Sequence, residues 1–367
     1  MLKPIFAIVS LALLALLAYL ALWPVPIRPV SWVAPPPPGY VGVHAVNQRL
    51  VGLQNINLGE EEGPEHVAFG PDDKLYAAVA SSRLLRMNAD GSSQQIFAST
   101  GGRVLGFAFD AAGNMIAADA FKGLLSITPD ATVRVLTDRV NGDPIRYADA
   151  VVVGRNGRIY FTDASTRFGP AEWGGTFEAS ILDIIEQSAT GRVLEYDPTR
   201  GTTRIVARGL SFANGVTLST DERWLFVAET GRYRVWKIDT GAADLDLATG
   251  PSAQARVLLD NLPGYPDNLM RGHGGRIWMG FTKPRSRIVD GMADKPWLRS
   301  ITLRLPRLLW PVPKPYGHVI AFTEDGRIVA DLQDPSGAYP ETTAVTETAD
   351  RLYVQSLHAK VLGWKAK

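Results

Sequence analysis

Five oxygen-bearing side chains stand in equivalent settings along the chain, each just before a short apolar run. They are Glu65, Asp149, Asn214 and the adjacent pair Asp267 and Asn268. Carboxylate and amide oxygens are hard ligands of the kind that Ca²⁺ takes at about 2.3–2.6 Å. Several acidic groups gathered at one point would repel one another strongly without a cation. We therefore predict that these residues hold Ca²⁺ or another divalent cation; the alternative for each one singly is a turn residue that bonds the local backbone.

Other common chemistries lack support in the residues. The chain has no Cys, which excludes disulfides, thiol nucleophiles and Cys-based metal sites. Its five His are scattered, and it contains no H-E-x-x-H, G-x-S-x-G or Walker sequence. The formal net charge of +1 gives no electrostatic footprint for nucleic acid, so we expect no nucleic-acid partner.

Two further sets of polar residues are interpreted as structural. His66 follows Glu65 directly and so points to the other side of its strand, which predicts a packed core histidine. Another acidic set recurs after the second strand of successive repeats, where we expect it to cap turns beside Lys122, Arg167 and Arg232; its members are Asp119, Asp163 and Glu229.

The elements that must position the oxygen ligands are short strands. From about residue 50, polar turns of Gly, Asn and Asp chemistry lead repeatedly into β-rich apolar runs, which is typical of hairpins. Six such turns occur: Pro71–Lys74, Ala112–Asn114, Arg155–Arg158, Thr220–Arg223, His273–Arg276 and Ala349–Arg351. Three or four strands per repeat predict an all-β, six-bladed β-propeller over residues 49–367, with Leu50–Leu58 closing the ring. The alternative, an open sheet of stacked hairpins, would curl or split at this strand number.

The propeller hypothesis explains why remote residues would meet. The innermost strands of all blades converge on one axis, so residues at the starts of those strands face one another. The five candidate ligands stand at such starts in blades one, three, four and five.

Two inserts exceed the length of the repeat, at about 167–189 and 283–316. The second insert is apolar and basic, which predicts a lid over the channel mouth or a patch that touches the membrane. The alternative is a helix packed on the side of the propeller.

The first 48 residues form a separate unit. Ile5 to Trp23 contain 19 residues without a charge, long enough to cross a bilayer as a helix. We favour an uncleaved membrane anchor over residues 1–24, with a cleavable signal sequence as the alternative. Residues 25–48 are a Pro-rich, extended linker. The anchor would place the propeller on the extracytoplasmic side of the membrane.

Four stretches carry a resemblance to a known family: Tyr160–Phe168, Phe212–Val216, Val227–Tyr233 and Leu262–Asn268. They resemble the strictosidine-synthase-like branch of the gluconolactonase and paraoxonase propellers. The resemblance implies a six-bladed propeller with Glu65, Asn214 and Asp267 as Ca²⁺ ligands and Asn268 as an addition. The chain departs from the family at Asp149-Ala150, where Asn-Asp is usual. It also has Thr343 where the plant synthase has its catalytic Glu, with Glu341 two residues away.

These observations favour a Ca²⁺-dependent hydrolase of lactones or esters that acts on a small molecule. A bound cation would stabilise an oxyanion, and Asp267 or a His near the mouth would activate water. The alternatives are a non-catalytic, membrane-anchored binding propeller and a strictosidine-synthase-type enzyme that forms C–N bonds.

Overall fold

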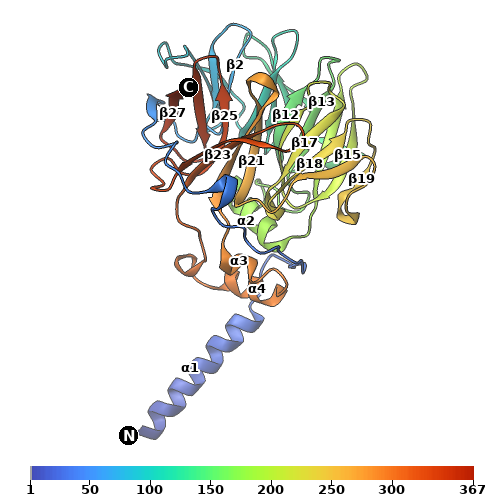
Figure 1. Cartoon of the computed structure of the whole chain (residues 1–367). Coiled ribbons are helices and arrows are strands. Elements are labelled where there is room, and N and C mark those ends of the chain that lie inside the picture. The colour runs from blue at the N-terminus through green and yellow to red at the C-terminus, as the bar shows by residue number, and fades with distance from the viewer. Residues whose placement is uncertain (1) are drawn as a thin grey trace.

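The computed structural model describes residues 2–367 and confirms the six-bladed β-propeller (Figure 1). Each blade is an antiparallel sheet of four strands, and blade three gains β19 (Leu245–Asp246) at its edge. Blades one to three consist of β2 (His66–Phe69), β3 (Leu75–Ala78), β4 (Arg83–Met87), β5 (Gln95–Ser99); β6 (Val104–Phe109), β7 (Met115–Asp119), β8 (Gly123–Ile127), β9 (Val133–Thr137); and β12 (Ala148–Val153), β13 (Ile159–Asp163), β14 (Gly191–Asp197), β15 (Thr202–Leu210). A short hairpin, β10 (Arg139–Val140) and β11 (Asp143–Pro144), joins blades two and three.

Blades four to six repeat the pattern. They consist of β16 (Ala213–Leu218), β17 (Trp224–Glu229), β18 (Arg234–Asp239), β20 (Ala255–Leu259); β21 (Gly264–Arg271), β22 (Ile277–Pro284), β23 (Gly317–Phe322), β24 (Ile328–Asp334); and β25 (Thr342–Glu347), β26 (Arg351–Ser356), β27 (Val361–Ala366), β1 (Gln54–Asn57). The innermost strand of each blade contacts the innermost strands of the two neighbouring blades, around the axis. These six strands are β2, β6, β12, β16, β21 and β25. The residues at their starts therefore lie at one end of a common channel.

The ring closes through its two ends, as the sequence predicts. β1 pairs with β27 in an antiparallel ladder from Gln54 opposite Trp364 to Asn57 opposite Val361. Pairing an N-terminal strand into the blade that holds the C-terminus ties the two ends of the chain together and so closes the ring of blades.

The core lies between the blades. All five residues of β13 are buried, as are all five of β7, because a neighbouring blade covers each face. Such strands are nearly continuous apolar runs without strict alternation. The packing between blades fixes the distance of each inner strand from the axis.

Four inner strands carry the same irregularity at the same place. In each, two residues oppose one residue of the second strand, which is the definition of a β-bulge. The bulged pairs are Asp149-Ala150, Asn214-Gly215, Asp267-Asn268 and Thr343-Ala344. A bulge bends its strand and re-aims its side chains, so it turns the first member of each pair toward the channel.

The two inserts form a helical cap at one end of the propeller. α2 (Thr176–Glu186) lies next to the blades, with α3 (Arg287–Asp290) and α4 (Pro296–Arg304) beyond it (Figure 1). Buried Arg299 joins the inserts by donating to Ile185 O at 2.8 Å and to Ala293 O at 3.1 Å. The second insert therefore lies over the channel end, and the alternative of a helix on the propeller's side is wrong.

The N-terminal helix α1 (Leu2–Leu22) projects from this cap (Figure 1). Its segment Pro4–Leu22 is long and apolar enough to cross a membrane, although a signal sequence meets the same criteria. The guanidinium of Arg304 in α4 donates to Leu20 O at 2.8 Å and to Trp23 O at 2.6 Å. Thus α1 and the cap are in direct contact.

The Pro-rich segment that follows α1 packs on the propeller instead of hanging free. Val30 N donates to Glu186 O at 2.8 Å, and Trp32 N donates to Ala293 O at 3.2 Å. Further along, the Asp331 carboxylate is hydrogen-bonded to His44 at 2.8 Å and to His318 at 3.0 Å. Asn47 and Gln333 also donate to it, so this carboxylate is fully engaged in fastening the segment to blade five.

Close approach of the inner strands generates a first prediction. A Cβ at Gly215 would lie 2.5 Å from both Asp267 O and Leu269 N, whereas a Cβ at Gly142 meets nothing within 4 Å. We expect Gly215→Ala to lower the free energy of unfolding by about 1–3 kcal/mol through overpacking. Gly142→Asn, at a φ of +81° that Asn tolerates, is the matched control with little effect. Thermal unfolding measures both, and equal stabilities would contradict the close-packed channel wall.

Candidate metal centre

Four of the five predicted ligands line one pocket at the capped end of the channel. Glu65, Asp149, Asn214 and Asp267 line it together with Arg103. The four are only 4–6% exposed. Asn268 lies directly behind them, and its Nδ2 donates to the backbone oxygen of Glu65 at 3.2 Å. The structure therefore brings together all five residues that the sequence singled out.

The carboxyl groups of this cluster are held apart from water and close to one another. Burial raises the pKa of Asp149 well above its usual value, and the nearby Asp267 and Glu65 raise it further. Burial and Glu65 likewise raise the pKa of Asp267. Burial also raises the pKa of Glu65, against the opposing effect of Arg103. Both physical causes, desolvation and mutual repulsion, would be relieved by a cation among the three groups.

One cation of the protein already sits at the cluster. Arg103 Nη2 pairs with Glu65 Oε2 at 2.5 Å, and its Nη1 donates to Ala80 O at 2.7 Å. If all three carboxyl groups are ionised, the cluster and this one guanidinium carry a formal charge of minus two. Buried charge of this size requires compensation, because the interior cannot solvate it. A single divalent cation has the matching charge.

Two amide oxygens provide an independent fit test. Asn214 Oδ1 and Asn268 Oδ1 are fully buried and accept no hydrogen bond. A buried acceptor without a partner costs free energy, and in native proteins it calls for an explanation such as an ion. The donors are all oxygens, which suits Ca²⁺ or Mg²⁺ and not the softer metals that prefer His or Cys. The residues present therefore fit a Ca²⁺ ion.

A histidine and a carboxylate that the sequence did not connect lie at the mouth of the same pocket. His358 lines the pocket, and its Nδ1 is hydrogen-bonded to Glu341 Oε2. Lys283 donates to the other oxygen of Glu341. Glu341 adopts a φ of +54°, an uncommon conformation for a non-glycine residue, of the kind found at functional sites.

The hydrogen bonds within this group set its charges. Burial alone would raise the pKa of Glu341, but His358 and Lys283 outweigh it and lower the value to about 2. The hydrogen bond that His358 donates to the Glu341 carboxylate raises the pKa of His358, with a smaller contribution from Glu65. An imidazole oriented through one nitrogen by a carboxylate is the usual arrangement of a general base.

Neither Arg103 nor His358 was singled out by sequence reasoning. Arg103 stands in blade two, where the inner strand offers no acid, and His358 lies in the loop after β26. Their roles depend on contacts across the channel, so no local pattern marks them.

The remaining predicted residues behave structurally. His66 is buried, and its ring stacks on Phe107 with centroids 4.7 Å apart, as expected for a core histidine. Asp163 accepts a hydrogen bond from the backbone N–H of Tyr147 and forms an ion pair with Arg192 at 2.8 Å. The prediction that places it beside Arg167 is therefore wrong. Thr343, at the bulge of blade six, donates its hydroxyl to Glu65 O at 2.7 Å.

The fold and site define a six-bladed propeller with an anionic, oxygen-lined centre at one end of its channel. Its relatives agree. The family model for strictosidine synthase matches residues 149–240, and that for the strictosidine synthase-like N-terminal region matches residues 42–87. Protein strictosidine synthase-like 6 of Arabidopsis thaliana is 31% identical over 332 residues, covering 86% of this chain and 83% of that protein. The chain therefore belongs to the strictosidine synthase-like family.

Other comparisons extend the likeness. The adipocyte plasma membrane-associated protein of Salmo salar is 28% identical, covering 95% of this chain and 86% of that protein. Among solved structures, a gluconolactonase from Xanthomonas campestris superposes with a TM-score of 0.60 at 18% identity, covering 94% of this chain and 99% of the other. The calcium-binding protein regucalcin from Agrobacterium tumefaciens gives a TM-score of 0.56 at 14% identity, covering 85% and 93%. These structures share the fold.

The charge balance of the cluster generates a second prediction. Adding Ca²⁺ at 100 times its dissociation constant should stabilise the chelator-treated protein by about 2.7 kcal/mol, because only the folded state assembles the site. Asp267→Asn should remove most of this gain. Asp138→Asn, at an exposed side chain, is the matched control and should keep it. Thermal unfolding with and without Ca²⁺ measures the effect; a gain of equal size in the Asp267 variant would contradict the site.

Proposed function

We propose that this protein is a Ca²⁺-dependent hydrolase of lactones or esters, tethered to a membrane by α1. The observation that carries the proposal is the buried cluster of three carboxyl groups and two amides beside a single guanidinium, in a pocket that also contains His358. Glu65, Asp149, Asn214, Asp267 and Asn268 would hold the cation. When bound there, Ca²⁺ supplies a Lewis acid that polarises a carbonyl oxygen.

The names of similar proteins support parts of this proposal. One structural neighbour is described as a gluconolactonase, and another as calcium-binding. A relative is named for its association with the plasma membrane. Because the two structures are distant in sequence, the argument for hydrolysis rests mainly on the site itself.

We assign the role of general base to His358 and that of its positioning residue to Glu341. With Nδ1 hydrogen-bonded to Glu341, the Nε2 nitrogen remains to accept a proton. His358 takes a proton from water as the water oxygen bonds to the carbonyl carbon. The bond from that carbon to the leaving oxygen then breaks, and His358 returns the proton to that oxygen. Asp267, the other base considered, stays with the ligand cluster.

The condensation reaction of a strictosidine synthase is disfavoured by one observation. Thr343, which matches the position of the synthase's catalytic Glu, has its hydroxyl committed to Glu65 O. The non-catalytic binding propeller remains the alternative, and a substrate panel distinguishes it from the hydrolase.

A third prediction tests hydrolysis directly. The full chain should hydrolyse members of a panel of lactones and aryl esters with Ca²⁺ present, and a chelator should abolish turnover reversibly. Asp267→Asn should lower kcat/KM by at least about 100-fold, in line with the loss of electrostatic stabilisation at an oxyanion. The exposed-site variant Asp138→Asn should retain full activity. Turnover that survives both the chelator and Asp267→Asn would rule out this mechanism, and no turnover on any member would favour the binding propeller.

A fourth prediction concerns pH. Because Glu341 raises the pKa of His358, the neutral base forms as pH rises through a value above the usual one, and kcat/KM should rise there. Glu341→Gln removes the largest cause of that shift, so the rise should move to lower pH while kcat falls. Burial and Arg103 oppose the shift and Glu65 supports it, and all three remain in the variant. His358→Gln should lower kcat by about 10²–10⁴-fold and remove this limb. A pH profile unchanged by either substitution would exclude His358 as the base.

A further inference from the structure

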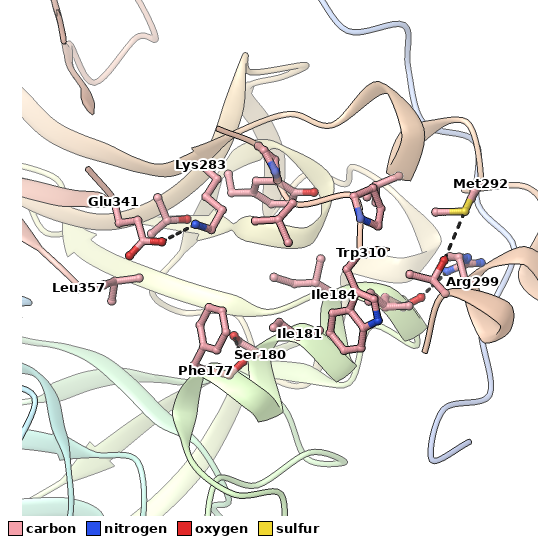
Figure 2. Close-up of a pocket in the computed structure, with 18 residues that line it drawn as sticks. Phe177, Ser180, Ile181, Ile184, Lys283, Met292, Arg299, Trp310, Glu341 and Leu357 are labelled. Atoms are coloured by element: carbon pink, nitrogen blue, oxygen red, sulfur yellow. Dashed lines mark hydrogen bonds and ion pairs between the residues drawn. The ribbon is translucent and has the colours of Figure 1, made fainter. Parts of the chain in front are cut away.

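An apolar chamber lies between the two inserts (Figure 2). Its volume is about 180 Å³. α2 contributes Ile181, Ile184 and Ile185 to its wall, and the second insert contributes Met292, Trp310 and Val312. In Figure 2 the pair formed by Lys283 and Glu341 marks one end of the chamber, and Met292 lies toward the other.

The chamber and the metal pocket adjoin each other. Phe177, Ser180 and Ile184 of α2, together with Thr282 and Leu357, line both of them. A single molecule can therefore place one end at the oxygen cluster and the other end among the isoleucines. The shared lining indicates which molecule would cover the apolar wall. It would be the part of a bound molecule that lies away from the oxygen cluster.

Most polar groups of the chamber are already engaged. Lys283 and Glu341 neutralise each other, and Glu341 also binds His358. The guanidinium of Arg299 donates to backbone oxygens of Ile185 and Ala293, and Thr302 Oγ1 donates to Leu298 O. A molecule rich in hydroxyl groups would lose its hydrogen bonds with water here and find few replacements, whereas a hydrocarbon chain loses none.

The wall formed by the second insert has an outward face beside α1. Trp310 lines the chamber, but its neighbours Leu308 and Leu309 are 94% and 61% exposed, and Val312 is 62% exposed. The same insert contacts α1 through Arg304. The apolar outer face therefore lies on the side of the molecule from which α1 projects (Figure 1).

We propose that this chamber binds the hydrocarbon tail of an amphipathic ester or lactone, which reaches the site from the bilayer that holds α1. The proposal rests on the proposed hydrolase function and names its substrate class: a carbonyl group at the cluster with a medium or long apolar chain. Each methylene that enters the chamber leaves water and strengthens binding by a factor of about three to four, until the chamber is full.

The first test is the dependence of kcat/KM on chain length. Full-length protein in nanodiscs with Ca²⁺ is assayed with p-nitrophenyl esters from four to twelve carbons. We expect the ten-carbon ester to exceed the four-carbon ester by at least 100-fold. Ile181→Trp, which fills the chamber, should reduce that ratio at least tenfold. Ile96→Trp, at an exposed site on β5 of the propeller, is the matched control and should leave the ratio unchanged. Equal ratios in all three proteins would overturn the proposal.

The second test does not need turnover. A non-hydrolysable methyl ketone with a ten-carbon chain and a terminal diazirine is photolysed in the nanodiscs, and the labelled peptides are mapped. Label on the peptides of Ile181, Met292 or Trp310, lost in Ile181→Trp, supports the chamber. Label confined to α1 or to the outer surface overturns it. Label in the chamber without hydrolysis of any ester would refute the hydrolase and leave the tail site standing, so the two failures are distinguishable.

Discussion

The burial of three carboxylates at one point on the propeller axis is the constraint on which the rest of the structure depends. Glu65, Asp149 and Asp267 are almost inaccessible to water, and only one guanidinium compensates them. An uncompensated charge in the interior costs far more than any single apolar contact returns, so the fold must supply either a proton or a cation. The unpartnered oxygens of Asn214 and Asn268 favour the cation, because a single cation can be bound by several oxygens at once, whereas each added proton satisfies only one acceptor.

The architecture serves this centre in a specific way. Blades that close as a ring hold six inner strands at a set distance from one axis, and a repeated β-bulge turns a side chain of four of them into the channel. Glycines such as Gly215 let adjacent inner strands approach without a Cβ between them. The two inserts, which the other blades lack, cover this end of the channel. They add the apolar chamber next to the pocket that contains the carboxyl groups. A charged pocket covered in this way is shielded from bulk water, which strengthens the electrostatic interactions inside it.

Much of this organisation could be predicted from the amino-acid sequence, because it repeats. The polar turns recur six times, and Asp149, Asn214 and Asp267 precede equivalent strands, so the propeller and the meeting of these oxygen-bearing side chains at one end of the channel could be predicted from periodicity. The pairing of Arg103 with Glu65 and of His358 with Glu341 could not be predicted, since each joins residues from different blades that share no pattern. A lid over the channel was one of the positions expected for the second insert, but the contact that fastens it could not be predicted: Arg299 is basic, yet it is buried among backbone oxygens of three segments. The Pro-rich segment was expected to be an extended linker, and its contacts with Glu186 and Asp331, which fasten it to the cap and to blade five, could not be predicted.

The central claim is that one divalent cation occupies the channel at the three carboxylates. The most direct measurement is long-wavelength anomalous diffraction from crystals of the protein grown with Ca²⁺. We predict a single strong anomalous peak on the propeller axis, about 2.3–2.6 Å from oxygens of Glu65, Asn214 and Asp267. Density at that point with no anomalous signal, or a peak only at His44, His318 and Asp331 on blade five, would contradict the account.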